Sequence, residues 1–422
     1  MHPRRSSSGM RKRCLLAACL AVSGLLVSGL PLAAGQEAIV AEGGVWKQVS
    51  PFRSSGEPIT RLQITSRGAV RVRGERGAHR VSGALTKRVK AANARSARLR
   101  LDPIQVAVNS QGGVLMVEVT GPEREGAELV LELTVPRQLQ QTAVQTRWGD
   151  VDVTELDGSV FVESGGGTVR LDAIGHDAIA RTGGGEMRLG RIGGSMNCAT
   201  GGGTIRVDSI GGNAEFSTGG GEIWVREVRG ALRASTAGGS IHIERAGGQV
   251  VANTGGGLIE VAHAGGAVAA TTSGGSIEVG GGKNVQCESG AGTIRLKASS
   301  GALRAATSHG MILAEISAGA MLSNSILAAS RGDIIVYLPS NLAVTVRARI
   351  EPAVDGRANS RGNSSEGAPA ETADRIVSEF GEIQAYRDRG RAITAQGRLN
   401  GGGAVLELAV SGGSIYLRRL KP

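Results

Sequence analysis

The segment TGGGTIRVDSIGGNAEFS, which spans Thr200–Ser217, decides the fold because versions of it follow one another from Ser164 to about Ala314. Each version opens with a Ser or Thr before a Gly-rich turn, and seven of these residues are 18 residues apart: Ser164, Thr182, Thr200, Thr218, Thr236, Thr254 and Thr272. After one spacing of 17 residues, two further copies begin at Ser289 and Thr307. Repetition at a fixed period is the sequence signature of a repeat architecture.

Within each copy, apolar residues alternate with polar ones. In the copy that opens at Thr200, Ile205 and Val207 flank Arg206, and the second half alternates in the same way around Glu215. Alternation in short runs bounded by glycine predicts two half-buried strands of about five residues each per unit. Such a pair cannot bury its apolar face alone, so the units must stack. The sequence therefore predicts an all-β fold, a β-helix-like parallel β-solenoid with 18-residue rungs of two short strands and Gly-rich corners.

Stacking would align equivalent residues of successive rungs in columns. The columns that contain Val160, Val169 and Leu171 are apolar in every copy, and we expect them to form the core. The Ser/Thr column has the same parity, so its hydroxyl groups are expected to point inward and bond to the backbone. Glycine is expected at the corners for two reasons, because corners need positive φ and because successive rungs approach closely there.

The first 35 residues have the composition of a secretory signal peptide. A basic stretch, Arg11–Arg13, precedes an apolar run that ends at the small residues Ala33–Gly35. This order predicts export and cleavage before Gln36, and Met10 is an alternative start that would shorten the basic region. A lipid anchor at Cys19 is less well supported, because only about five apolar residues precede it.

Export places the mature chain in the periplasm, the outer cell envelope or the extracellular space. No later stretch approaches the roughly 20 apolar residues of a transmembrane helix. Removal of the five basic residues of the signal peptide lowers the net charge from +11 to about +6. This mild charge, together with an aromatic content of 2%, argues against nucleic acid as a partner. We expect a monomer.

The regularity of the repeat divides the mature chain into three parts. Residues 36–147 contain irregular strands that are expected to cap the solenoid, and a separate small β domain is the alternative. Within them, Leu85–Arg100 lacks both glycine and alternation and predicts a short helix or a flexible loop. Regular repeats occupy 148–340. Residues 341–422 are expected to return to the solenoid, apart from a mobile Gly/Ser-rich loop at 356–374.

A search for reactive or metal-binding patterns predicts no cofactor, no metal site and no catalytic residue. The Gly-rich corners lack the Asp of calcium-binding repeats and the Gly-Lys-Ser/Thr of phosphate loops, and the histidines show no metal-ligand spacing. Cys198 and Cys287 lie on one inward column, five rungs apart, so they are expected to be buried free thiols and to form no disulfide.

The outward column six residues after the Ser/Thr carries the candidate binding site. Arg170, Arg188, Arg206 and Trp224 occupy successive rungs of this column. Such a positive stripe that ends in an aromatic ring is suited to an anionic envelope polysaccharide, and surface proteins are the other class of partner. Asp172 and Asp208 lie two residues further on and are expected to neutralise Arg170 and Arg206 in part.

The same column also carries the alternative function. Glu260 and Glu278 are neighbours about 4.8 Å apart, which would suit the carboxylate pair of a carbohydrate-active β-helix enzyme, either a polysaccharide lyase or a glycosidase. Glu is also common on any polar outward face, and no insertion interrupts these rungs to shield the pair from water. The sequence therefore favours a protein that is not an enzyme.

Two segments of the chain carry a family resemblance. LELTVPRQLQQTAVQTRWGDVDVTELDGSVFVESGGGTVRLDAIG and the later GRLNGGGAVLELAVSGGSIYLRR resemble the putative-adhesin family of exported bacterial β-strand-repeat proteins, a family whose domain has no known function. The likeness covers most of residues 60 to 420. It implies a β-solenoid in the cell envelope with a role in adhesion or as a scaffold, and it brings no catalytic motif.

Overall fold

The repeated segments fold into strands that pair in parallel with the strand one repeat away. The computed structural model describes residues 38–56, 58–122, 126–317, 319, 321–351, 375–387 and 392–420. Nearly all regular structure in these residues is β, and most strands belong to one long sheet in which parallel pairing predominates. The prediction of an all-β fold is confirmed. The signal peptide and the loop at 356–374 lie outside the described residues.

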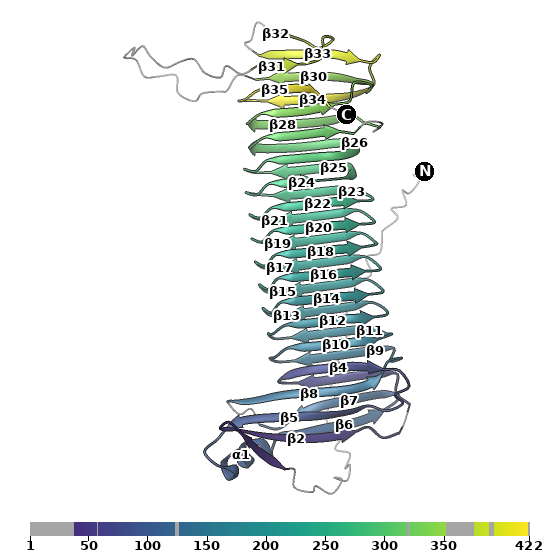
Figure 1. The fold of residues 1–422 in the computed structure, drawn as a ribbon, viewed down its shortest axis with the longest axis vertical. Helices are drawn as coiled ribbons and strands as arrows, with labels where there is room; N and C mark the ends of the chain where they lie inside the picture. Colours follow the sequence, from purple (N-terminus) through teal and green to yellow (C-terminus); the bar gives the residue numbers. More distant parts are fainter. Residues whose placement is uncertain are drawn as a thin grey trace, which may run out of the picture. The chain divides into compact units, whose positions relative to one another are not determined.

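Successive strands of the regular repeats alternate between two rows. The first row contains β9 (Gln141–Thr146), β11 (Ser159–Ser164), β13 (Ala178–Thr182), β15 (Met196–Thr200), β17 (Ala214–Thr218), β19 (Leu232–Thr236), β21 (Val250–Thr254) and β23 (Ala267–Thr272). The second row contains β10 (Val151–Leu156), β12 (Val169–Ile174), β14 (Met187–Ile192), β16 (Ile205–Ile210), β18 (Ile223–Val228), β20 (Ile241–Ala246), β22 (Ile259–Ala264) and β24 (Ile277–Val279). Within a row the register advances by one repeat, so that Met187 of β14 lies opposite Ile205 of β16 (Figure 1).

Five further strands continue both rows. They are β25 (Gly282–Ser289), β26 (Ile294–His309), β27 (Ile312–Ile316), β28 (Ser325–Arg331) and β29 (Ile334–Leu338). The single long strand β26 serves both rows, because its first half pairs with β24 and its second half with β25. The one-residue slip in the sequence appears as a shift in register between β23 and β25.

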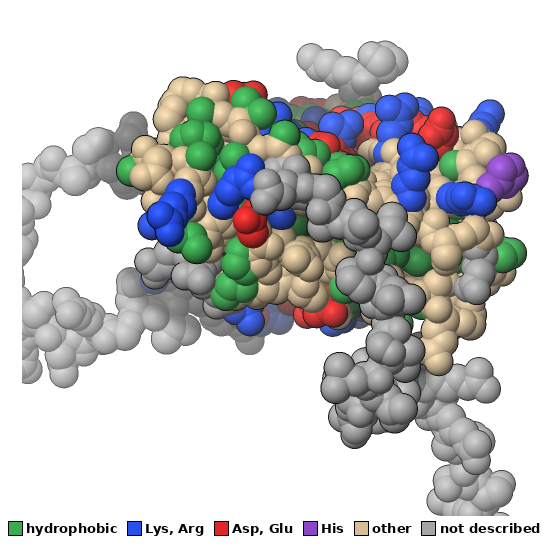
Figure 2. Space-filling view, turned by 90° about the horizontal axis from the view of Figure 1, so that it is seen from below, with side chains coloured by type: hydrophobic (Ala, Val, Ile, Leu, Met, Phe, Trp, Pro, Cys, Tyr) green, Lys and Arg blue, Asp and Glu red, His purple; other side chains and the backbone are tan. Residues whose placement is uncertain are grey.

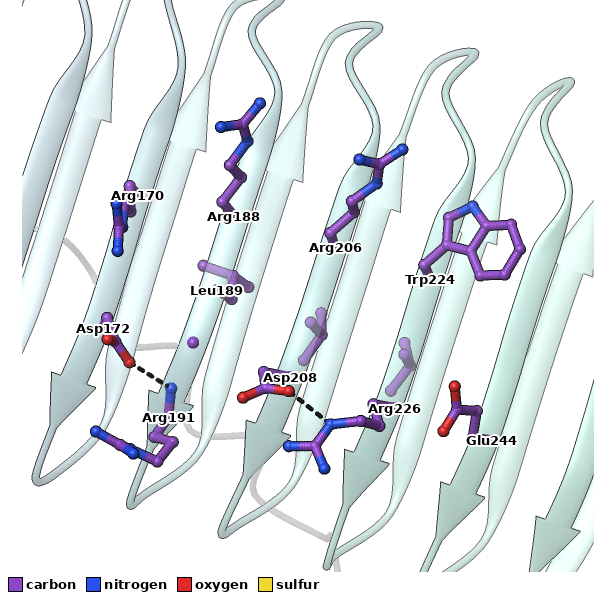
Figure 3. Close-up of a pocket in the computed structure, with 13 residues that line it drawn as sticks. Arg170, Asp172, Arg188, Leu189, Arg191, Arg206, Asp208, Trp224, Arg226 and Glu244 are labelled. Carbon is purple, nitrogen blue, oxygen red and sulfur yellow. Dashed lines mark hydrogen bonds and ion pairs between the residues drawn. The ribbon is translucent and has the colours of Figure 1, made fainter.

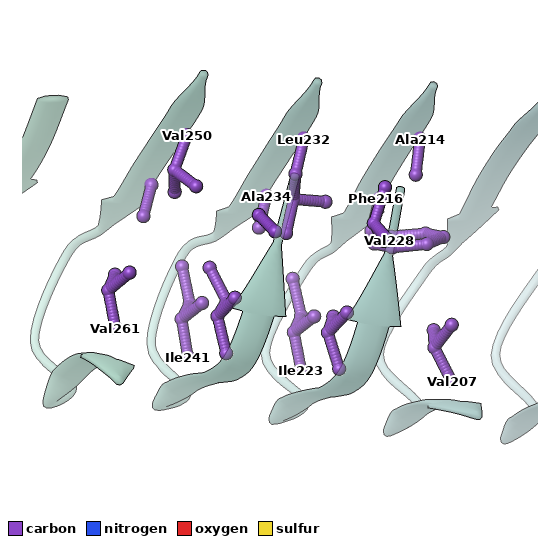
Figure 4. Packing of buried hydrophobic residues seen from close by; sticks show 14 of the residues in the cluster. Val207, Ala214, Phe216, Ile223, Val228, Leu232, Ala234, Ile241, Val250 and Val261 are labelled. Atoms are coloured by element: carbon purple, nitrogen blue, oxygen red, sulfur yellow. The ribbon is translucent and has the colours of Figure 1, made fainter. Parts of the chain in front are cut away.

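The core lies between the two rows. Figure 4 shows Val207, Ile223 and Ile241 of the second row facing Leu232 and Val250 of the first. The three predicted apolar columns are buried throughout, and each fully buried aliphatic side chain contributes roughly 1.5–3 kcal/mol. The alternation of the sequence thus becomes an apolar interior and a polar exterior. Cys198 and Cys287 are buried free thiols, as predicted, and burial raises the pKa of both, that of Cys287 to about 12.

The inward hydroxyl ladder is also confirmed. Thr182, Thr200 and Thr218 are buried, and each hydroxyl donates to the carbonyl of the last corner glycine of the preceding rung, over 3.1, 2.8 and 2.8 Å. The same bond recurs up to Thr307, where it spans 3.0 Å. Each such bond contributes about 1 kcal/mol, so the ladder fixes one corner on the next.

The expectation of positive φ at the regular corners is wrong. In the fully described stretch 168–300, no glycine has a positive φ. Glycine is needed there for space alone, because a Cβ on Gly201 or Gly219 would collide with the carbonyl oxygen of the glycine one rung below. Positive φ appears at the margins of the repeat, for example at Gly167 and Gly301.

At the N-terminal side of the repeats, strands distant in sequence continue the two rows. The elements are β1 (Ile39–Glu42), β2 (Val45–Arg53), β3 (Arg61–Ser66), β4 (Ala69–Glu75), β5 (Ser82–Lys90), α1 (Ala94–Leu101), β6 (Gln105–Gln111), β7 (Val114–Thr120) and β8 (Ala127–Pro136). Strands β3 and β4 lie between β7 and β9 and between β8 and β10, all in parallel. Antiparallel pairing begins beyond them, where β5 joins β8 to β2 and β6 covers β7.

The segment Leu85–Arg100 is partly strand and partly helix. It begins inside β5, and α1 starts after Asn93, whose side chain accepts a bond from the amide of Ser96 over 2.9 Å. Lys87 is buried, and its ammonium group donates to the carbonyls of Ile104 at 2.7 Å and Leu101 at 3.4 Å. Lys87 therefore holds the end of α1. No helix in the described ranges is long and apolar enough to cross a membrane.

Near the C-terminal side, the strands are again out of sequence order. The elements are β30 (Val344–Ile350), β31 (Ile376–Ser378), β32 (Gln384–Arg387), β33 (Ile393–Leu399), β34 (Ala404–Val410) and β35 (Ile415–Arg419). Strands β34 and β35 pair in parallel with β28 and β29, and β30 and β31 pair with β34 and β35 in turn. The later strands therefore lie between earlier ones.

Candidate functional site

The four predicted binding residues lie together in one shallow hollow on the outer face of the second row. This hollow, which we call the Arg–Trp groove, has a volume of about 770 Å³ and extends over β12, β14, β16, β18 and β20. Figure 3 shows its two side-chain rows, with Arg170, Arg188, Arg206 and Trp224 along one side. The opposite row lies two residues further along each strand, because residues i and i+2 of a strand point to the same face.

The arginine row is exposed and carries net positive charge. The side chains of Arg188 and Arg206 are 60% and 62% exposed, and both face Glu186, at 2.8 and 3.8 Å. The hydrogen bond from Arg188, together with the charges of both arginines, lowers the pKa of Glu186 despite its partial burial. Arg170 has no ion-pair partner among the described residues. One carboxylate therefore orients two guanidinium groups and leaves the row cationic.

Trp224 closes the row as a fixed aromatic platform. Its ring stacks on His242 with a centroid distance of 3.9 Å and an angle of 14° between the planes. Its indole Nε1 donates to Glu222 over 2.9 Å, and 42% of the residue remains exposed. His242 is in turn held by Glu260 at 3.0 Å. One face of the indole is thus occupied by His242, and the opposite face is left for a ligand.

The opposite row is mixed in charge. Asp208 accepts a bond from Arg226 over 2.5 Å, and this bond raises the pKa of Arg226. Asp172 accepts from the backbone amide of Arg191 over 3.0 Å. The expectation that these two aspartates neutralise Arg170 and Arg206 is therefore wrong, because each carboxylate bonds to a residue of its own row, Arg191 or Arg226.

Gly190 gives Asp172 the room for this bond. It occupies the position of Asp172 one rung later, and a Cβ at residue 190 would collide with the Asp172 carboxylate. The carboxylate leans over the glycine to reach the amide of Arg191. A conformationally fixed acceptor therefore faces the arginine row.

Sequence reasoning missed the two residues that position this row. Glu186 and Glu222 stand two residues before Arg188 and Trp224, on the same face of the strand. A signal was present, because these two corners read Thr-Gly-Gly-Gly-Glu, whereas the corners at Thr200 and Thr236 place Thr or Ser at that position. A corner Glu that stands two residues before an outward Arg or Trp therefore indicates the position of the groove in the sequence.

Glu260 and Glu278 lie side by side in register on β22 and β24. Each has its own cationic or imidazole partner, His242 for Glu260 and Lys297 at 2.9 Å for Glu278. The neighbouring strands are joined by short turns, so no long loop shields the two carboxylates from solvent. In the described part of the chain, no cluster of three or more His, Cys, Asp or Glu side chains could hold a metal ion.

The chemistry of the groove follows from its two rows. Exposed guanidinium groups donate paired hydrogen bonds to carboxylate, sulfate or phosphate. The carboxylates of Asp172, Asp208 and Glu244 on the opposite row accept hydrogen bonds, for which sugar hydroxyls are suitable donors. The free face of Trp224 can stack on an apolar sugar face. The groove thus offers one type of group for each part of an acidic saccharide.

The chain matches no protein-family model and no curated protein. Solved structures similar to it include a putative cell adhesion protein from Clostridium sporogenes, at 8% identity and a TM-score of 0.17 over 89% of this chain and 99% of that one. A putative adhesin from Bacteroides fragilis is 12% identical, with a TM-score of 0.26 over 63% and 95% of the two chains. A putative adhesin from Parabacteroides merdae is 15% identical, with a TM-score of 0.26 over 57% and 92%.

The names of these neighbours agree with the family resemblance found in the sequence. At such identities and scores they carry no argument about what the chain binds, which has to come from its own surface.

Proposed function

We propose that the chain is an exported, non-enzymatic protein of the bacterial cell envelope, an adhesin or scaffold that binds an anionic envelope polysaccharide in the Arg–Trp groove. The observation that carries this proposal is the exposed arginine row, which Glu186 orients and Trp224 completes. The site is proposed as Arg170, Arg188, Arg206 and Trp224, with Glu186 and Glu222 as positioning residues.

The finer fold is part of the proposal. We infer a parallel β-solenoid with an 18-residue rung of two strands, regular over 148–340, capped by 36–147 and completed by 341–422. Its support is the register of the second row, in which Val169, Met187 and Ile205 are successive partners at a spacing of 18 residues. A solenoid of this kind aligns the equivalent outward position of every rung, so arginines on three successive rungs form a row.

The direction of the groove favours a linear polymer. Its rows cross the strands, so equivalent residues recur about every 4.8 Å. From Arg170 to Trp224 the row covers three such steps, or about 14 Å, along a shallow hollow on the outer face of the strands. A chain molecule can therefore pass along the groove and continue beyond it. Surface proteins with acidic segments are the second class of partner.

The proposal that the protein is not an enzyme rests on the carboxylates. A glycosidase needs one carboxylic acid in a shielded site and a second carboxylate free to act. Glu260 and Glu278 are both partly exposed, and each is engaged by a partner on the same face. We propose a monomer that needs no cofactor and is located in the periplasm, the outer envelope or outside the cell.

Sedimentation with envelope fractions tests the proposed function. Mature protein, residues 36–422, is incubated with the fractions at low and high salt, beside a variant with Arg170, Arg188 and Arg206 changed to Ser. The matched control changes Arg181, Arg233 and Arg304 to Ser, which removes the same charge from exposed positions of the first row.

We expect salt-sensitive binding by the wild type and the control, and its loss in the groove variant. Equal binding by all three proteins would refute the groove as the site. Equal weakening of both variants would show that only net charge matters.

A further inference from the structure

We propose a second binding site for an acidic saccharide, built around Trp148 on the first row of strands. It lies in a hollow of about 840 Å³, which we call the Trp148 hollow. The ends of β7, β3, β9 and β11, which are adjacent in the sheet in that order, form its floor. Three of these strands belong to different parts of the sequence, so the sequence alone does not bring the site together.

Trp148 is the most exposed of the three tryptophans. The chain has three tryptophans, and Trp46 is a structural one whose indole donates to the Ala91 carbonyl over 2.9 Å. Trp148 is 63% exposed at the corner between β9 and β10. Both exposed tryptophans lie in hollows that also hold arginine and acidic side chains.

The corner that carries the indole is held by its neighbours. A Cβ on Gly166, in the corner of the next rung, would stand 3.3 Å from the Trp148 ring, so the glycine allows the ring to lie against that corner. The hydroxyl of Thr146 donates to the carbonyls of Trp148 at 3.0 Å and Gly68 at 2.7 Å, which ties the two corners together. The backbone that carries the indole is therefore fixed before any ligand arrives, which lowers the entropy cost of binding.

The hollow has an unsatisfied cationic donor. Arg67 and Arg147 follow the paired residues Ser66 and Thr146, so their positions are neighbours on adjacent strands. The Nη2 atom of Arg67 is shielded from solvent and has no hydrogen-bond partner. A shielded donor without a partner costs roughly 1–3 kcal/mol. Arg67 lines the hollow, so a turn of its guanidinium group toward a bound anion would satisfy this donor, which points to a ligand with a carboxylate, sulfate or phosphate.

The remaining lining identifies the rest of the ligand. Glu118 and Glu163 supply carboxylate acceptors, and Thr65 and Gln145 between them can both donate and accept. A ring that presents an apolar face to Trp148 and hydroxyls to these residues fits an acidic saccharide. This composition matches that of the Arg–Trp groove, although the two hollows lie on different rows of strands. Two sites on one chain would increase avidity for one polymer or join two polymers.

Oligogalacturonate, a short carboxylate-bearing saccharide, is the probe, and maltohexaose is the neutral control. Binding is measured by titration calorimetry and equilibrium dialysis with mature wild type, Trp148→Ala, Trp224→Ala and the double variant. Met321→Ala is the matched control, since it truncates another exposed side chain outside both hollows. Circular dichroism checks that each variant folds.

We expect two sites in the wild type, one in each single variant and none in the double variant, because ligand concentrations are chosen so that a site weakened at least about ten-fold is no longer detected. Arg67→Gln is expected to weaken the same site that Trp148→Ala removes. Quenching of the remaining tryptophan fluorescence in Trp224→Phe would report the Trp148 hollow directly.

The results separate this inference from the proposed function. Binding that Trp148→Ala removes and Trp224→Ala leaves intact would support the inference even if the Arg–Trp groove binds nothing. A single site that only Trp224→Ala removes would overturn the inference and leave the groove standing. No binding to the wild type, or equal binding of maltohexaose, would overturn the acidic-saccharide site.

Discussion

The regular rungs and the N-terminal strands use the same alternating pattern, but they connect it in different ways. In the regular part, β14 pairs with β16, and Met187 meets Ile205 one repeat later. In the N-terminal part, β3 pairs with β9, and Arg61 meets Gln141 across several intervening strands. Regular rungs are held by contacts with immediate neighbours, whereas the N-terminal strands depend on a distant segment of the chain.

The reasons for glycine and for buried polar groups differ in the same way. Regular corners need glycine at positions such as Gly219 and Gly221 because the backbone of the preceding rung leaves no room, whereas N-terminal turns such as the one at Gly77 need it for positive φ in open space. Regular rungs bury a uniform ladder of hydroxyls, whereas the N-terminal part buries a single lysine beside a helix. The regular part is therefore stabilised by the same contacts repeated at every rung, and the N-terminal part by contacts that each occur once.

The largest effect is expected from Gly221→Ala in the regular part. Its Cβ would collide with the backbone of Gly203 and Thr204, and we expect a loss of about 3 kcal/mol in the free energy of unfolding. Gly220→Ala is the matched control in the same corner, because that position has open space around it, and its change should stay within about 0.5 kcal/mol. Urea denaturation measures both. Similar losses in the two variants would contradict the steric account.

A smaller and more local effect is expected from Lys87→Met in the N-terminal part. The carbonyls of Leu101 and Ile104 would lose a buried donor, at a cost of about 2 kcal/mol. Fluorescence of Trp46, which packs in the same cluster as α1, should report the loss when Trp148 and Trp224 are changed to Phe in both proteins. Arg88→Met is the control, because that side chain is partly exposed and its ion pair with Glu128, at 3.9 Å, contributes little.

Thiol reactivity provides a separate probe for unfolding of the regular part. Cys198 and Cys287 are buried with raised pKa values, so a thiol reagent should reach them only when the regular rungs open. We expect Lys87→Met to shift the Trp46 transition and leave the thiol transition in place. A joint shift would mean that both parts unfold as one cooperative unit, and the contrast between them would fail.

The smallest effect is expected at Gly77. This residue has a φ of +79° and nothing near its side-chain position, so Gly77→Ala should cost about 1 kcal/mol through backbone strain alone. Gly77→Asn should recover most of that loss, because asparagine tolerates the left-handed region. Gly221→Asn should recover nothing. Thermal unfolding compares the three variants, and a failure of asparagine at residue 77 would argue against a conformational role for that glycine.

The regular part of the fold could be predicted from the sequence because the spacing between repeats equals the offset between paired residues of neighbouring strands. The columns of Val160, Val169 and Leu171 are inward as expected, and so is the Ser/Thr ladder. The pairing of β3 with β9 could not be predicted, because nothing in the sequence measures a register across unrelated strands. The buried position of Lys87 was missed for a related reason, since its partners belong to the end of α1.

The candidate site was predicted only as far as one column reaches. Periodicity places Arg170, Arg188, Arg206 and Trp224 on one face, and the structure gathers them in one groove. The orientation of their side chains depends on corner residues such as Glu186. Glu186 belongs to a different column of the repeat, so aligning the Arg–Trp column alone does not reveal it. Trp148 was not identified because it stands at a corner, where the alternation of the strands gives no information.

The position of β34 and β35 has a consequence for the order of folding. Regular rungs can form as the chain emerges, each on the one before it, as expected for folding that proceeds from the N-terminal side. Strands β28 and β29 must wait for β34 and β35, because β30 and β31 pair only with the strands that arrive later. Until then, β28 and β29 present open parallel edges, the kind of surface that recruits strands from other molecules. Synthesis that stalls before residue 404 would thus leave a nearly finished chain with an aggregation-prone edge, and rapid arrival of β34 and β35 would shorten the time for which this edge is open.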